Sequence, residues 1–149
     1  MGDAPPTGRE HGDMDAREAI IRSEATYEAW HFAEATRVGN IVWVSGQRGY
    51  DAYDLISDDP AEQARVALRN LAEVLRRAGA DLADIVDLTS YHVNMADVDG
   101  FRIAKDELIQ PPYPSWTVVG VHELATPEMK VEVKAVAVIG SGATARVRR

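Results

Sequence analysis

The chain has 149 residues and no cysteine, which excludes a disulfide scaffold, thiolate zinc sites, iron–sulfur clusters and thiol nucleophiles. It carries 16 basic and 24 acidic side chains, a formal net charge of −8, so we expect no nucleic-acid partner. No run approaches about 18 consecutive apolar residues and residues 1–15 lack the apolar core of a signal peptide, so we expect one domain, no membrane partner and a cytoplasmic location.

Three segments are expected along the chain. Residues 1–19 combine glycine, proline and charged side chains, which predicts a disordered or extended N-terminal extension. Residues 20–140 are predicted to form the single domain, and residues 141–149 a flexible basic tail. Over residues 16–29 the pattern leaves a strand and a short helix equally open.

The first clear element is a hairpin. Gly39-Asn40 is a turn signal between residues 32–38 and the β-branched and aromatic run 41–44. Downstream, the sequence Asp59-Pro60-Ala61-Glu62 predicts the start of a helix over about residues 60–78. The Asp59 side chain can accept from the amide of the third helical residue, and Glu62 can complete a capping box. Gly79 fits the position just after such a helix.

The second half of the chain predicts three strands and another helix. Residues 85–93 alternate as a strand, with Val86, Leu88, Ser90 and His92 on one face. Asp97 can cap a helix that Pro111-Pro112 ends, and residues 116–121 and 131–139 form the last two strands. This order predicts an α+β, two-layer sandwich: a mixed sheet of at least five strands with two helices on one face.

Metal and nucleotide cofactors are not expected. The four histidines lack metal-ligand spacing, and no glycine-rich phosphate loop occurs; the histidines are His11, His31, His92 and His122.

Three other features allow two interpretations each. Glu132 interrupts an otherwise apolar strand, the last of the chain. It is interpreted either as a half-exposed strand residue or as a pocket carboxylate that positions water. Trp116, which follows Tyr113-Pro114-Ser115, is more typical of a core or interface anchor than of a ligand platform. Arg48 is a loop cation or a bidentate clamp for a substrate carboxylate.

Three motifs in the right order resemble the Rid family, also called the YjgF or UK114 family. They are residues 35–47 ending in Ser45-Gly46-Gln47, residues 63–79 with Asn70-Leu71 and Ala78-Gly79, and residues 131–137 around Glu132. The resemblance covers about residues 30–139. It implies a chorismate-mutase-like sandwich that assembles as a homotrimer, with small-molecule clefts between subunits and no cofactor.

The resemblance also implies an activity, the hydrolysis of reactive enamines and imines to ammonia and a 2-keto acid. Glu132 matches the family's water-directing carboxylate, Ser45 and Gly46 match the cleft loop, and Phe32 replaces a cleft tyrosine. Trp116 stands where deaminase members carry the arginine that grips the substrate carboxylate. This departure implies a substrate other than the usual 2-imino acid, with Arg48 as a possible relocated cation.

The sequence therefore predicts Glu132 as the catalytic residue of an imine or enamine hydrolase. The alternatives are a non-catalytic trimer that binds a small molecule and an endoribonuclease or translation inhibitor, which the acidic charge disfavours. The expected partners are further copies of this chain and a small molecule. The candidate substrate-binding residues are Phe32, Ser45, Gly46, Arg48, His92, Tyr113 and Trp116.

Overall fold

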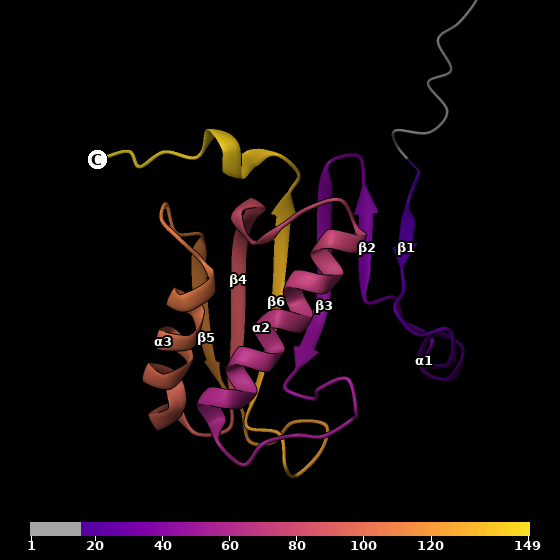
Figure 1. The fold of residues 1–149 in the computed structure, drawn as a ribbon, viewed down its shortest axis with the longest axis vertical. Coiled ribbons are helices and arrows are strands. Elements are labelled where there is room, and N and C mark those ends of the chain that lie inside the picture. The colour runs from indigo at the N-terminus through magenta and orange to yellow at the C-terminus, as the bar shows by residue number, and fades with distance from the viewer. Residues whose placement is uncertain (1–15) are drawn as a thin grey trace, which may run out of the picture.

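The computed structural model describes residues 16–149 (Figure 1), so the prediction for residues 1–15 falls outside the described part. The elements in chain order are β1 (Glu18–Ile20), α1 (Glu24–Trp30), β2 (Ala35–Val38), β3 (Ile41–Arg48), α2 (Pro60–Arg77), β4 (Ile85–His92), α3 (Val98–Leu108), β5 (Ser115–Gly120) and β6 (Val131–Val138). Both structures left open for residues 16–29 are therefore present, a short strand followed by a short helix.

A single mixed sheet organises these elements. Its strand order is β1-β2-β3-β6-β4-β5, and β4 and β5 are parallel while the other neighbours are antiparallel. Helices α2 and α3 lie side by side on one face of the sheet, and α1 lies beyond the β1 edge (Figure 1). The α+β sandwich is thus confirmed, with a sixth strand and a third helix at the N-terminal edge.

Helix α2 supplies most of the core, and most of its predicted signals are present. Asp59 caps it by accepting from the Ala61 amide at 3.0 Å, and Gly79 follows it with a φ of +87°. The capping box was wrong: Asp59 accepts from the second helical residue, and Glu62 instead pairs with Arg65 at 3.4 Å. One apolar stripe of α2 is buried against the sheet: Ala64, Ala67, Leu68, Leu71, Val74 and Leu75.

The strands expose one face and bury the other. In β6 the residues that face α2 are buried, whereas Glu132 and Lys134 point to the opposite face. In β4 a register shift between Ile85 and Asp87 buries Ile85 and leaves Val86 exposed. The prediction that Val86 shares a face with Leu88 was therefore wrong, because simple alternation does not anticipate a bulge.

The second long helix begins differently from the prediction. Asp97 makes no capping hydrogen bond with its side chain, and Asn94 caps a short 3₁₀ turn just before α3 by accepting from the Ala96 amide at 3.0 Å. Phe101 and Ala104 then bury the inner face of α3. Within residues 16–149, no helix is both long and apolar enough to span a bilayer.

Candidate functional site

A β-bulge in β3 creates the centre of the candidate site. Val44 pairs with Ala135 and Gln47 with Val133, so Ser45-Gly46 together oppose the single residue between these partners on β6. A Cβ placed on Gly46 would lie 1.9 Å from Glu132 Oε1. The glycine therefore leaves the space that the Glu132 carboxyl occupies.

Glu132 lies on the sheet face that the helices leave uncovered. Its neighbours across the sheet are Arg48 on β3 and Tyr91 on β4. The carboxyl is half-buried, and this burial raises its pKa above the ordinary value of 4.5, while the positive charge of Arg48 opposes the rise. A carboxylate of raised pKa accepts a proton more readily, which suits a general base.

A hollow of about 560 Å³ opens next to this bulge. It lies between the start of α1, the end of β3, the loop after β3 and the outer side of α2. Of the predicted site residues, Phe32, Gly46 and Arg48 line it. Glu132 is not part of its lining but lies against Gly46, at the edge of the hollow.

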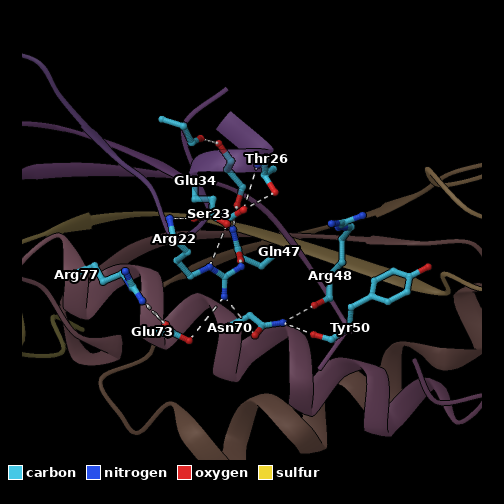
Figure 2. Close-up of polar contacts among 12 residues, drawn as sticks. Arg22, Ser23, Thr26, Glu34, Gln47, Arg48, Tyr50, Asn70, Glu73 and Arg77 are labelled. Carbon is cyan, nitrogen blue, oxygen red and sulfur yellow. Dashed lines mark hydrogen bonds and ion pairs between the residues drawn. The ribbon is translucent and has the colours of Figure 1, made fainter. Parts of the chain in front are cut away.

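An ion-paired network forms one side of the hollow, and Figure 2 shows Arg22 at its centre. Arg22 donates from Nε to Glu34 at 3.1 Å and from a terminal nitrogen to the buried Gln47 at 3.0 Å. Glu73 lies 3.8 Å from Arg22 and 3.1 Å from Arg77. The network fastens the segment before α1 to β3 and α2, and it satisfies the polar groups beneath the hollow.

Asn70 on α2 holds the opposite side of the hollow. Its amide donates to the carbonyl oxygens of Arg48 at 2.8 Å and Tyr50 at 2.9 Å (Figure 2). The Arg48 guanidinium stacks over the Tyr50 ring, 5.2 Å from its centroid. The Tyr50 hydroxyl forms a 2.7 Å hydrogen bond with that of Thr126, which holds the ring in place.

Ser45 lies next to the hollow, but its hydroxyl is already bonded. It donates to the Ala33 carbonyl at 2.7 Å, and the Ser45 amide donates to the Glu34 carbonyl at 2.9 Å. Both bonds fasten the bulge to the segment that precedes β2. Ser45 therefore positions Gly46.

The structure does not bring His92, Tyr113 and Trp116 to this hollow within the chain. Trp116 packs on Phe101 on the helix side of the sheet, with ring centroids 5.6 Å apart. Its indole donates to Ser90 Oγ at 2.9 Å, and the same oxygen lies 2.8 Å from Nε2 of the fully buried His92. Burial lowers the His92 pKa, which favours the neutral imidazole.

Tyr113 belongs to the same group through a lysine. The ammonium of Lys105 lies 4.9 Å from the centroid of the Tyr113 ring and 5.3 Å from that of Trp116, and it pairs with Asp106 at 2.6 Å. These contacts fasten α3 to the start of β5. In the described part of the chain, no group of three or more histidine, aspartate and glutamate side chains is placed to hold a metal ion.

Comparison with known proteins shows the family of the chain. The model of the family described as Endoribonuclease L-PSP matches residues 23–139, which is most of the chain. The chain belongs to the Rid (YjgF/UK114) family.

Two curated relatives and two solved structures illustrate the similarity. The RutC family protein YjgH of Escherichia coli is 35% identical over 109 residues, 72% of this chain and 83% of that protein. The 2-iminobutanoate/2-iminopropanoate deaminase of Bos taurus is 31% identical over 134 residues, 87% of this chain and 95% of the relative. Rv2704 of Mycobacterium tuberculosis has a TM-score of 0.75 at 28% identity, and covers 83% of this chain and 100% of its own. A solved structure of protein YJGH has a TM-score of 0.73 at 34% identity, and the match covers 83% of this chain and 96% of that one.

In this Rid protein, several motif residues serve as scaffold. Gln63 accepts from the Lys130 amide at 2.8 Å and donates to the carbonyls of Ser57 and Glu128, so it joins two loops to α2. The sequence did not indicate Arg22 and Glu34 as site residues. Arg22 lies in the ambiguous segment 16–29, and the pairing of the two residues depends on tertiary structure. The motif positions Gln47 and Asn70 were the available signal, since both contact Arg22.

Proposed function

We propose that this Rid protein hydrolyses a small imine or enamine, with Glu132 as the residue that activates water. The observation that carries the proposal is the half-buried Glu132 carboxyl, held against Gly46 at the edge of the hollow. The family membership supports it, and 2-iminobutanoate/2-iminopropanoate deaminases are among the relatives.

The reaction requires one group that accepts and returns a proton. Water attacks the carbon of the protonated imine while Glu132 takes one water proton, which leaves a neutral amine on a carbon that now carries a hydroxyl. The protonated Glu132 then gives its proton to that nitrogen, the carbon–nitrogen bond breaks and ammonia leaves, and the ionised Glu132 accepts the hydroxyl proton as the carbonyl forms. An enamine enters the same sequence once protonation of its carbon gives the protonated imine.

The residues that hold the proposed substrate differ from those that the resemblance assigns to the binding of the usual 2-imino acid. The position that the resemblance assigns to the clamping arginine carries Trp116, and its ring is packed on Phe101 on the far side of the sheet from Glu132. Phe32 at the hollow also lacks a hydroxyl with which to bind a polar substrate group.

A homotrimer is part of the proposal, with each hollow completed by a neighbouring copy. The sheet face opposite the helices supports it, because that face presents apolar side chains to solvent in the single chain: Trp43 is 44% exposed and Val86 40%. Light scattering should give about three times the chain mass of 16.3 kDa. A chain-sized particle that still turns over substrate would contradict this part of the proposal.

The activity is tested with purified wild type and Glu132→Gln. An amino-acid oxidase generates 2-iminobutanoate in place, and semicarbazide captures whatever imine the protein has not hydrolysed; an imine without a carboxylate is tested in parallel. Wild type should accelerate hydrolysis of at least one imine, and Glu132→Gln should lose about 10²- to 10⁴-fold of that acceleration. Equal rates for the two proteins, or no acceleration by wild type, would refute the assignment.

A further inference from the structure

The hollow is lined by three arginines that differ in their partners. Arg22 is paired with Glu34, and Arg77 with Glu73. Arg48 forms no ion pair with any residue of the described chain, although it lies directly across the strand pair from Glu132. Arg48 is thus the guanidinium of the hollow that is available to an anionic ligand.

The surroundings of Arg48 hold it in place without using its hydrogen bonds. Asn70 fixes its backbone carbonyl, and its guanidinium carbon lies over the Tyr50 ring, 5.2 Å from the centroid (Figure 2). The guanidinium donates no hydrogen bond to a described residue, and its planar fork of N–H groups matches the two oxygens of a carboxylate. The contact with the ring limits the freedom that Arg48 would lose on binding.

None of the acids that line the hollow forms an ion pair with Arg48; they are Glu34, Asp51, Asp54 and Glu73. The Asp51 carboxylate already accepts hydrogen bonds from the amides of Tyr53 and Leu55, both at 2.9 Å. Glu132 lies across the strand pair from Arg48, and its carboxyl packs against Gly46. The positive charges of Arg22 and Arg77 are balanced within the network by Glu34 and Glu73.

Arg48 and Glu132 are close enough to act on one small molecule. Side chains directly opposite each other on neighbouring antiparallel strands have Cβ atoms about 5 Å apart. We propose that Arg48 binds the anionic group of the substrate, so that the site takes small imines or enamines that carry a carboxylate. This inference rests on the proposed function and adds the substrate's charge. The cation that binds the substrate's anionic group is therefore on β3, and not at the Trp116 position on β5.

Binding tests this inference without turnover. The probes are 2-oxobutanoate, the carbonyl product of 2-iminobutanoate hydrolysis, and its neutral isostere 2-oxobutanamide, each titrated by NMR or calorimetry. Wild type should prefer 2-oxobutanoate to the amide. Arg48→Gln should weaken 2-oxobutanoate binding by about ten- to a hundredfold and leave amide binding unchanged. Arg48→Lys, which keeps the charge but loses the planar fork, should fall between the two.

Arg102→Gln on α3 is the matched control, since it removes the same charge at an arginine that lies outside the hollow and is already paired with Asp99 and Asp106. It should bind 2-oxobutanoate as wild type does. The inference is overturned if wild type does not bind 2-oxobutanoate, if Arg48→Gln binds it equally well, or if Arg102→Gln weakens it as much. Glu132→Gln should retain binding, so failure of the proposed hydrolysis is distinguishable from failure of the Arg48 assignment.

Discussion

Replacing Gly46 by alanine should abolish activity while leaving the fold intact. The added Cβ would lie 1.9 Å from Glu132 Oε1 and 2.8 Å from its Cδ, whereas ordinary contact begins at 3.4 Å. The carboxyl oxygen must therefore move by about 1.5 Å. A misplacement of about 1 Å in a reacting group can cost about 100-fold in rate, so we expect a loss of at least that size.

Stability should respond much less to this change. The atoms that must move belong to the end of a flexible side chain, so the free energy of unfolding should change by no more than about 1 kcal/mol. Urea unfolding and the semicarbazide competition assay measure the two quantities on the same preparation.

Gly100→Ala on α3 is the matched control. Its Cβ would meet only Ala61, at an ordinary 3.5 Å, and it should stabilise the helix by up to about 1 kcal/mol without affecting the rate. Full activity in Gly46→Ala, or a loss in rate that only matches a loss of folded protein, would refute the role given to the bulge.

Three further predictions concern other parts of the chain. Because burial raises the Glu132 pKa, the folded protein binds more protons than the unfolded chain between about pH 4.5 and the raised pKa; the free energy of unfolding should therefore fall as pH rises through that interval, and Glu132→Gln should remove this slope in urea titrations. Asn70→Ala leaves two carbonyl oxygens without their donor, which should cost about 1–3 kcal/mol in thermal or urea unfolding and weaken carboxylate binding at Arg48; unchanged stability would show that water replaces the amide. Trp116→Arg places a charge against Phe101, so it should lose about 3 kcal/mol of stability and gain no imine hydrolysis; a stable and more active variant would contradict the placement of this ring.

The sequence was sufficient for elements with strong local signals. Helix α2 runs from Pro60 to Arg77 because a capping aspartate, a first-turn proline and Gly79 mark its ends, and its apolar stripe marks its inner face. Strand β3 extends beyond the run 41–44 that predicted it. Ser45-Gly46 forms a bulge in the strand, which continues to Arg48.

The candidate site could be predicted only in part, because local sequence patterns do not encode the face of the sheet or the contacts between distant segments. Gly46, Arg48 and Glu132 gather because their motifs lie on two paired strands, β3 and β6, whereas Phe32 lies between α1 and β2. For Trp116, alternation does not say which face of the sheet a residue takes, and its indole is bonded to Ser90 on the helix side. The Arg22 network depends on contacts between distant segments, which no local pattern encodes.

The most direct test of the account is a titration of the Glu132 carboxyl by NMR, compared with the pH dependence of kcat/KM for imine hydrolysis. If Glu132 is the base, its pKa lies above the ordinary glutamate value of 4.5, and the rate falls as pH is lowered through that same pKa. A carboxyl that titrates at 4.5 or below, or a rate that does not follow its ionisation, would contradict the assignment of Glu132 as the residue that activates water.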